Sequence, residues 1–372
     1  MRLHLSLIFA AALVISSPHD AASDIPIGFA NPLSGPFSLS GERNHIAVEM
    51  AVAAVNERGG VLGQKVTLVA ADDACGVKRA ITAARRLAEA GVRVVIGHGC
   101  SHSSLLAAGI YEAADILMIT PSSTHPRLTE EGRRNVFRLI GRDDSQGELA
   151  GDFLAKRYAR KRIAILHDGS TYGEGLAREA RRQLRARGKT ETLYGMYTPA
   201  AADYADVLRR LREARIEVLY VGGYGPDAGR ILRGARESGD DRLQLVGGDG
   251  VGMDGFWAVA GASGERTIFS GRPDVRDRPD AAAILERFRR AGFGSGIGGL
   301  GAYAAVQVWA QAVERAGSVE LDAVAEALRR SRFRSVLGQV AFDQKGDLED
   351  AAWQWKVWTD GDYVPLEKFA TQ

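Results

Sequence analysis

The chain has 372 residues, 45% of them hydrophobic, which is enough for a large core and for two domains. Lysine and arginine number 48 against 46 acidic residues, so the formal charge at pH 7 is only +2. The arginines are spread along expected helices with glutamates one turn away, a pattern typical of solvated helix faces. This distribution argues against a nucleic-acid partner, which would need a basic face with stacking aromatics.

The first 23 residues have the features of an export signal. Arg2 precedes the apolar run LSLIFAAALVIS, which is too short to span a bilayer, and small residues from Ala21 to Ser23 offer a cleavage site. No cysteine follows for a lipid anchor, and no later segment is long and apolar enough to span a membrane. We therefore expect a mature chain that begins near Ser23 or Asp24 and is located in the periplasm or outside the cell.

After the signal, short apolar runs alternate with amphipathic helical patterns. The runs predict buried parallel strands in IPIGFANP, KVTLVAADD, VRVVIGHG, ILMITPSS, RIAILHDGS, IEVLYVGGY and LQLVGGDG. Several helical patterns end at a glycine, as at Gly59, Gly91 and Gly188, which suits a helix C-terminus. A second strand–helix series begins after NVFRLIGRDDSQGELAG. The alternation predicts an α/β fold with two doubly wound parallel sheets and a ligand site in the cleft between them.

The two cysteines each follow an expected strand, Cys75 in VAADDAC and Cys100 in VVIGHGC. An exported chain meets oxidising conditions, so we predict a disulfide between them. That bridge would join two neighbouring strand-to-helix turns and hold Ser101 at a helix N-terminus. Free N–H groups and the helix dipole favour an anion there. The arrangement indicates capture of a small molecule rather than catalysis.

The motifs of the whole mature chain, taken in order, resemble those of one family. They are SGP, AVNERGGVLG, DDAC, VIGHGCS, ILMITPSST, DSQG, HDGSTYGEGLA, YVGGYGPDAGRILRGAR and FDQKGDL. They are similar to those of branched-chain amino-acid-binding proteins, the periplasmic receptors of ABC importers with the type I binding-protein fold. The resemblance implies a monomer without enzymatic activity or cofactor. It also implies three crossings between the lobes, with 24–141 and 273–350 in lobe 1 and 142–272 and 351–372 in lobe 2.

The resemblance assigns the head group of an α-amino acid to lobe 1. Ser101 matches a serine that hydrogen-bonds the α-carboxylate, and it also suits a helix N-cap. Ser122, Ser123 and Thr124 match the segment that holds both carboxylate and ammonium. Without the resemblance, this segment would be an ordinary turn before a proline.

Lobe 2 is expected to supply the contacts of the closed form. Tyr172 and Tyr224 match tyrosines that cover the ligand, although a tyrosine at a strand end often only packs. Asp249 aligns with an acidic residue that pairs with the α-ammonium, where the family has glutamate. Aspartate is one methylene shorter than glutamate. It could therefore contact the ammonium directly, contact it in a shifted ligand, or contact it through a bridging water. A helix cap is the other interpretation of Asp249.

The side-chain pocket departs from the family pattern. Ser40 and Gly298 stand where the family has two aromatic walls. We therefore expect a wider pocket and a side chain larger than leucine, such as an aromatic one, unless Phe37, Phe256 or Trp257 fills the space.

The sequence also contains residue types that could form a metal site. A zinc site would use His98, Cys100 and His102, with Cys75 or Asp73, but the disulfide competes for both thiols. The exported chain is not expected to hold a metal.

An exported NAD-dependent oxidoreductase would use GxGxxG at Gly250, Gly252 and Gly255, with Asp274 further on. The late position of this motif in the chain argues against a dinucleotide-binding domain. Nucleophilic catalysis lacks a GxSxG elbow, and the isolated His167 is expected to pack or cap.

The predicted mechanism is hinged capture of an amino acid, whose closed complex an ABC permease would recognise. A periplasmic sensor with the same fold is the alternative role.

Overall fold

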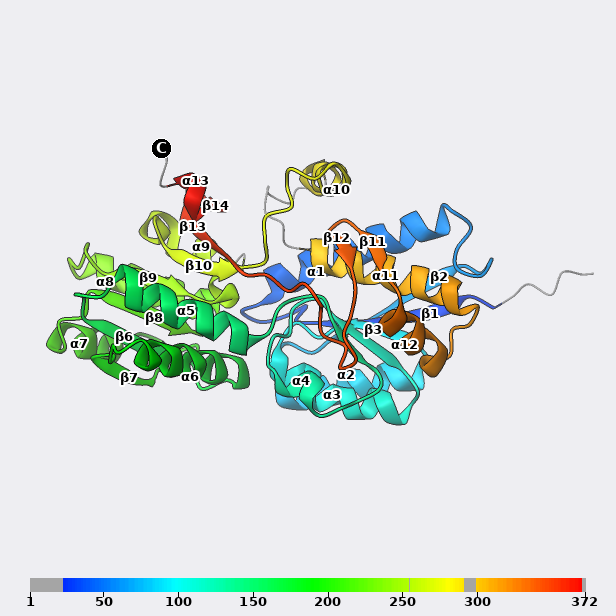
Figure 1. Cartoon of the computed structure of the whole chain (residues 1–372), viewed down its shortest axis with the longest axis horizontal. Coiled ribbons are helices and arrows are strands. Elements are labelled where there is room, and N and C mark those ends of the chain that lie inside the picture. Colours follow the sequence, from blue (N-terminus) through cyan, green and yellow to red (C-terminus); the bar gives the residue numbers. More distant parts are fainter. Residues whose placement is uncertain (1–22, 254, 291–298, 370–372) are drawn as a thin grey trace, which may run out of the picture.

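Two β-sheets, each covered by helices on both faces, form two lobes that lie side by side (Figure 1). The structure is a computed structural model that describes residues 23–253, 255–290 and 299–369. The predicted signal peptide therefore lies almost entirely outside the described residues, as does Gly298. Within the described part, no helix has both the length and the apolar character needed to cross a bilayer.

The first sheet has five parallel strands in the order β2-β1-β3-β4-β5. Their bounds are β1 Ile25–Asn31, β2 Val66–Asp72, β3 Val94–Gly97, β4 Leu117–Thr120 and β5 Val136–Arg138. The helices of this lobe are α1 Ser38–Asn56, α2 Val77–Glu89, α3 Ser101–Ala113, α4 Arg127–Glu130, α11 Leu300–Ala316 and α12 Leu321–Arg330. A short hairpin of β11 Phe333–Ser335 and β12 Gly338–Val340 follows.

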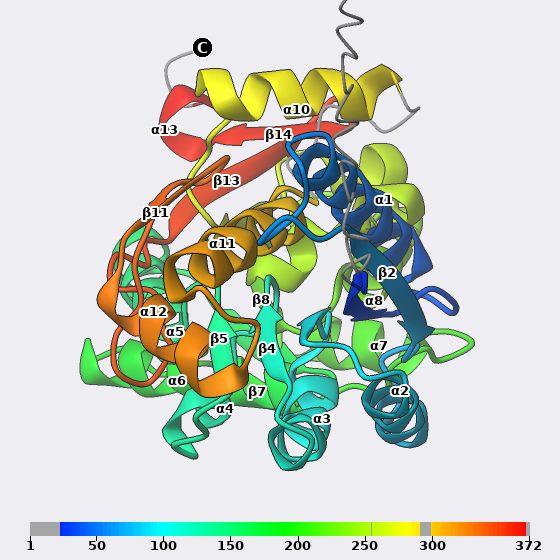
Figure 2. The same ribbon diagram turned by 90° about the vertical axis from the view of Figure 1, so that its right-hand side faces the viewer.

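Both faces of the first sheet are apolar, which is why its strands have continuous apolar sequences rather than alternating ones. Ile27 and Phe29 of β1 pack with residues of α1 and α11 on one face. Val95 of β3 and Met118 of β4 pack with α2 and α3 on the other. Figure 2 shows this lobe from its end, with α1 and α11 on one side of the strands and α2 and α3 on the other.

The second sheet has seven strands in the order β14-β13-β10-β9-β8-β6-β7. The parallel ones are β6 Ile163–His167, β7 Leu193–Met196, β8 Val218–Gly222, β9 Gln244–Gly247 and β10 Ile268–Gly271. The edge strands β13 Gln354–Thr359 and β14 Asp362–Pro365 are antiparallel. The helices of this lobe are α5 Asp143–Arg157, α6 Thr171–Ala186, α7 Ala205–Glu213, α8 Gly225–Glu237, α9 Gly255–Ala260 and α13 Leu366–Phe369, with 3-10 turns at Asp249–Gly252 and Gly261–Gly264. Helix α10 Pro279–Arg290 follows β10 in the chain but lies against the first lobe, where Asp280 pairs with Arg334 of β11.

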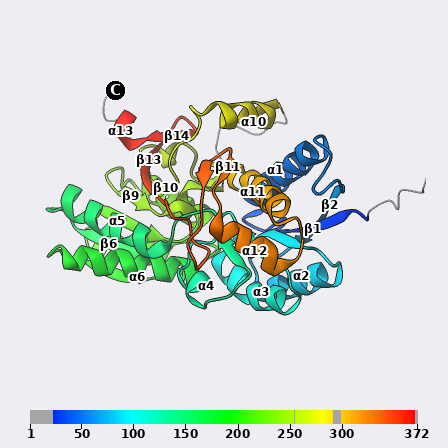
Figure 3. The same cartoon turned by 45° about the vertical axis from the view of Figure 1, so that its right-hand side comes forward.

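The order of elements takes the chain between the lobes three times. It passes from β5 to α5 and β6, from β10 to α11, which packs on α1, and from β12 to β13 (Figure 3). The expected lobe limits near Gly141, Pro273 and Asp350 lie in these three connections. Three connections between two lobes can act together as a hinge.

The predicted α/β fold with doubly wound sheets is confirmed. All seven predicted strands form and are parallel to their neighbours, and the sheets also contain three parallel strands that were not predicted, β5, β7 and β10. Strands β13 and β14 add an antiparallel edge that the apolar runs did not reveal. Gly59, Gly91 and Gly188 have positive φ values of 97°, 66° and 77°, as expected after helix ends.

The predicted disulfide between Cys75 and Cys100 is present, with a Cα–Cα distance of 5.6 Å. It joins the turn after β2 to the N-cap of α3, and Cys100 is 1% exposed. The paired residues are 25 positions apart, so the cross-link removes considerable freedom from the unfolded chain.

Replacing both cysteines by serine is expected to lower the free energy of unfolding by about 3.5 kcal/mol, from the loop-closure entropy of the unfolded chain. Urea denaturation of the oxidised native protein and the double variant measures this difference. The reduced native protein is the matched control and should resemble the variant. Equal stability of the oxidised and reduced native protein would contradict the prediction.

Candidate ligand-binding cleft

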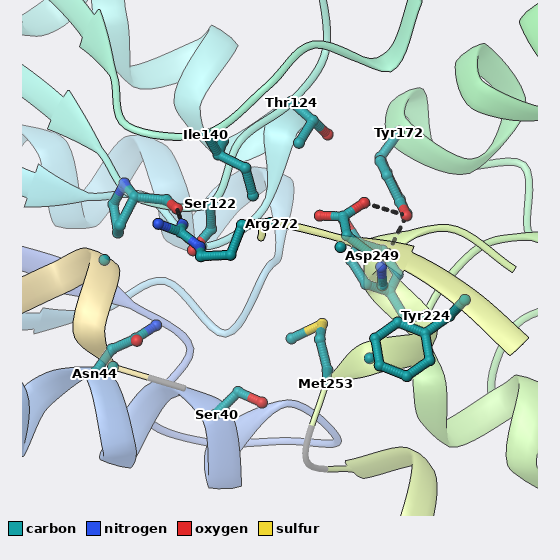
Figure 4. A pocket seen from close by; sticks show the side chains of 18 of the residues that line it. Ser40, Asn44, Ser122, Thr124, Ile140, Tyr172, Tyr224, Asp249, Met253 and Arg272 are labelled. Atoms are coloured by element: carbon teal, nitrogen blue, oxygen red, sulfur yellow. Dashed lines mark hydrogen bonds between the residues drawn. The ribbon is translucent and has the colours of Figure 1, made fainter. Parts of the chain in front are cut away.

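A cavity of about 170 Å³ lies between the two lobes, at the carboxyl ends of the parallel strands (Figure 4). In doubly wound sheets this edge is where ligands bind, because loops from several strands converge there. Seven of the predicted ligand residues line the cavity: Ser40, Ser101, Ser122, Thr124, Tyr172, Tyr224 and Asp249.

Lobe 1 contributes hydroxyls and a helix N-terminus. Ser101 is the first residue of α3, with the disulfide-bonded Cys100 as its N-cap, so the backbone N–H groups of the first turn are available to an anion. The Ser101 hydroxyl accepts a hydrogen bond from the His125 N–H at 3.3 Å, which leaves its own proton free to donate. Ser122 and Thr124 follow β4 and lie beside it in the lining. These groups suit a carboxylate.

Ser123 was expected at the ligand, but it is not part of the lining. Its hydroxyl is 2.7 Å from the Ser104 hydroxyl and donates to the His98 carbonyl, and its N–H donates to the Thr120 hydroxyl at 2.9 Å. The side chain is 1% exposed. Ser123 therefore holds the turn after β4 in place, while its two neighbours in the sequence face the cavity.

A buried ion pair supports the same turn from below. Arg138, at the end of β5, is fully buried, and its Nε lies 2.6 Å from an Asp347 carboxylate oxygen. Its guanidinium also donates to the carbonyl oxygens of Ser123 and His125, at 3.3 and 3.0 Å. Asp347 in turn lies 2.9 Å from Arg142, just before α5. This network fixes the segment that carries Ser122 and Thr124.

Lobe 2 contributes a carboxylate and two aromatic rings. The Tyr172 hydroxyl donates to an Asp249 carboxylate oxygen at 2.9 Å and accepts from the Gly250 N–H at 2.9 Å. Tyr172 and Tyr224 are in ring contact, with centroids 5.1 Å apart. Asp249 follows β9 and opens a short 3-10 turn. The tyrosine holds the carboxylate by one oxygen and leaves the other toward the cavity (Figure 4).

Burial raises the pKa of Asp249, and the hydrogen bond from Tyr172 opposes this shift. Burial and the charge of Asp249 raise the pKa of Asp143, at the start of α5, well above its usual range. Asp143 is 0% exposed and does not line the cavity. Because an uncompensated carboxylate is costly here, the site favours a cation near Asp249.

Several lining residues escaped the sequence analysis, above all two cations. Arg272 directly follows β10, and Lys356 lies in the antiparallel strand β13. The sequence did not predict a strand at β10 or at β13, so neither Arg272 nor Lys356 was expected at the edge of a sheet. The signal for Arg272 was present in the short apolar run TIFSG before it. Asn44, Ile140, Met253, Phe269 and Tyr363 also line the cavity.

The ligand types considered for zinc have other partners. His98 is fully buried, with one ring nitrogen 2.5 Å from Asp73 and the other 2.9 Å from the Tyr111 hydroxyl. His102 lies 2.6 Å from the Cys75 carbonyl oxygen. Across the residues that the structure describes, no cluster of three or more histidine, cysteine or acidic side chains is arranged for a metal.

The glycines of the possible dinucleotide motif are explained by the packing of the protein itself. A Cβ on Gly250 would lie 2.5 Å from the Gly223 carbonyl oxygen, and one on Gly252 would lie 2.4 Å from the Phe269 ring. Asp274, the acidic residue of that motif, forms an ion pair with Arg276. His167, as expected, packs against Tyr194 and accepts from the Gly169 N–H.

Two doubly wound lobes with a polar cavity between their strand ends define the class of bilobed solute-binding proteins. The comparisons agree with this assignment. A family model described as "Periplasmic binding protein" matches residues 24–361, and the chain belongs to this family.

Relatives with curated names are similar over almost their whole length. The Leu/Ile/Val-binding protein homolog 1 of Brucella suis biovar 1 is 36% identical over 96% of this chain and 98% of that protein. The leucine-, isoleucine-, valine-, threonine- and alanine-binding protein of Pseudomonas aeruginosa is 37% identical over 93% of each chain. Among solved structures, a leucine-binding protein of Thermotoga maritima aligns with a TM-score of 0.84 at 26% identity, over 92% of this chain and 97% of that one. The expected resemblance to branched-chain amino-acid-binding proteins is thus confirmed.

Proposed function

We propose that the protein is a periplasmic solute-binding protein that captures an α-amino acid by closure of its lobes and delivers it to an ABC permease. The observation that carries this proposal is the cavity itself. It places an anion site in one lobe, formed by Ser101, Ser122 and Thr124, opposite a carboxylate in the other lobe, Asp249. An α-amino acid presents the two complementary charges.

In this proposal the α-carboxylate binds first, to the hydroxyls of lobe 1 and the first turn of α3. Lobe 2 then brings Asp249 to the α-ammonium, while Tyr172 and Tyr224 cover the ligand. Closure expels water, which strengthens each charged contact. Ser40 lies at the side-chain end of this arrangement, and Gly298 is proposed there as well.

Two contacts across the cleft support a closed conformation in the structure. An Arg272 N–H donates to the Pro121 carbonyl oxygen at 2.9 Å, and the ring centroids of Phe37 and Tyr224 lie 4.8 Å apart. In each pair one residue belongs to the first-sheet lobe and the other to the second. A closed lobe pair presents one continuous surface to a permease, which lets the transporter distinguish loaded from empty protein.

The partners and location follow from the same proposal. The mature protein acts as a monomer in the periplasm, needs no cofactor and carries out no chemistry, because the permease and its ATPase drive transport. The names of the relatives support an amino acid as ligand, and one solved relative from Desulfitobacterium hafniense, 28% identical with a TM-score of 0.75 over 92% of this chain and 99% of that one, is a complex with leucine.

Calorimetry of the mature protein with a panel of L-amino acids tests the proposal. At least one amino acid is expected to bind, and its 2-hydroxy acid analogue, which lacks the ammonium, is expected to bind much more weakly. A ligand at 100 times its dissociation constant should stabilise the fold by about 2.7 kcal/mol, which a melting curve detects. Absence of binding by every amino acid would overturn the proposal.

Uptake separates import from sensing. A strain that lacks this protein should lose accumulation of the labelled ligand and regain it on complementation. Unchanged uptake together with tight binding would favour a periplasmic sensor.

A further inference from the structure

The head group of an α-amino acid leaves two charged side chains of the cavity unexplained. Arg272 and Lys356 both line it, and both come from the sheet of lobe 2. A cavity built for an aliphatic or aromatic side chain has no use for two cations, because burying a charge without a partner is costly. Their partner is therefore to be sought in the ligand.

The Arg272 guanidinium is poorly satisfied by the protein. It has five N–H donors, and within the part of the chain that the structure describes it donates one hydrogen bond, to the Pro121 carbonyl oxygen at 2.9 Å. Among the described parts of the chain, no carboxylate lies within 4.0 Å of it. Burial lowers its pKa and the charge of Asp249 raises it, so the nearest compensation is an acidic group that does not touch it.

The molecule makes room for this guanidinium on the side of lobe 1. Gly301, in the first turn of α11, faces it, and a Cβ at that position would lie 2.9 Å from an Arg272 terminal nitrogen and 3.2 Å from Pro121. The N-terminus of the 17-residue helix α11 adds positive potential at the same place. The location of Arg272 thus depends on a residue without a side chain in the opposite lobe.

Arg272 and the ammonium site lie at different ends of the cavity. In Figure 4 the Arg272 side chain runs toward Ser122 and away from Asp249, while Asn44 and Ser40 border the same end. Tyr172 and Asp249 lie together at the other end. Arg272 therefore lies across the cavity from the proposed ammonium site and beside Ser122, within reach of an anionic group of a ligand that Asp249 holds by its ammonium.

Lys356 is a second basic group in the cavity, and its protonation changes near neutral pH. It is 1% exposed, its Nζ lies 4.8 Å from the centre of the Tyr363 ring, and burial lowers its pKa to about 7. Asp274 and Asp362 raise that pKa and Arg272 and Arg276 lower it. Both of these carboxylates are already paired with Arg276. An anion in the cavity would raise the pKa of Lys356 and charge it.

Resting on the proposed function, we propose that the ligand is an α-amino acid whose side chain carries an anionic group, which Arg272 and Lys356 bind. A dicarboxylic amino acid is the simplest ligand of this class, and a phosphorylated or sulfonated side chain has the same chemistry. The wider pocket expected from Ser40 and Gly298 for a side chain larger than leucine is a separate prediction, and the two cations add a charge preference to it.

Matched ligand pairs test the inference on the native protein. We expect L-glutamate or L-aspartate to bind at least about tenfold more tightly than the amide of the same shape, L-glutamine or L-asparagine, and more tightly than L-leucine and L-phenylalanine. L-cysteate and O-phospho-L-serine separate a carboxylate from the other anionic side chains. If a neutral amino acid binds as tightly as every anionic one, the inference fails while the proposed function stands. If no amino acid binds, both fail.

Variants then assign the anion to its partners. Arg272→Met should weaken the acidic ligand at least about 30-fold and leave its amide nearly unchanged, because only the acid loses a buried ion pair. Arg272→Lys keeps the charge and should retain part of the preference. An equal loss for acid and amide in Arg272→Met would show that Arg272 holds the α-carboxylate, which overturns the inference.

Two controls make these results interpretable. Arg182→Met removes the same charge from an exposed position on α6 and should change neither affinity. Melting curves of each variant without ligand exclude misfolding as the cause. Calorimetry at pH 7 in buffers of different ionisation enthalpy should show proton uptake with the acidic ligand, and Lys356→Met should abolish it. Proton uptake that persists in Lys356→Met would remove Lys356 from the assignment.

Discussion

Asp249→Ala is expected to weaken binding of an α-amino acid by about 2–5 kcal/mol, because the α-ammonium would be left in a closed cleft without its counter-ion. The hydroxy acid analogue has no ammonium and should lose much less. Isothermal titration of both ligands with the native and variant proteins measures the two differences. The contrast between the two ligands, rather than the loss itself, identifies Asp249 as the ammonium partner.

Asp249→Asn is the conservative companion, because it keeps the shape and the hydrogen bond from Tyr172 but removes the charge. Native affinity for the amino acid should fall as the pH falls through the raised pKa of Asp249, since only the ionised carboxylate attracts the ammonium. The asparagine variant should lack this part of the pH dependence. Equal losses for amino acid and hydroxy acid would mean that Asp249 only closes the lobe or caps its turn.

Asp347→Asn is expected to lower the free energy of unfolding by about 3–5 kcal/mol, because it leaves the guanidinium of Arg138 buried without a counter-charge. The same change releases one of the contacts of Arg142. Urea denaturation monitored by circular dichroism measures the effect. Ligand affinity should also fall, since Arg138 holds the carbonyl oxygens of the segment that carries Ser122 and Thr124.

Asp322→Asn is the matched control for this effect. Asp322 pairs with Arg134, and both side chains are exposed. Exposed pairs contribute only about 0–1 kcal/mol, so this variant should be close to the native protein in stability. A loss of similar size in both variants would show that burial of the Arg138–Asp347 pair does not matter.

The fold was largely predictable because short stretches of sequence indicate its strands and helix ends. Parallel strands covered on both faces need continuous apolar runs, and VVIG of β3 and IAILH of β6 are recognisable without knowledge of their neighbours. Glycine after a helix, as at Gly91, is likewise a requirement of the local backbone. Strands β13 and β14 were missed because they pair at an antiparallel edge and lack such a run.

The position of most of the expected ligand residues in the cavity lining was predictable for a related reason. Ser101, Thr124 and Asp249 each follow a recognisable strand, and strand ends converge on one edge in any doubly wound sheet. Ser123 shows the limit of this reasoning. It has the same residue type as Ser122 and adjoins it, yet it faces the interior and bonds Ser104, because successive residues of a turn point in different directions.

The sequence by itself therefore determined the two-lobed α/β architecture, the disulfide partners and most of the polar residues that line the cavity between the lobes. Only the tertiary structure placed two cations in the lining of this cavity. Arg272 and Lys356 both line it from positions 84 residues apart, and Gly301 of the other lobe makes room for Arg272. Periodicity reports which face of an element is buried, whereas the charge of a cavity depends on which distant side chains the closed lobes bring together.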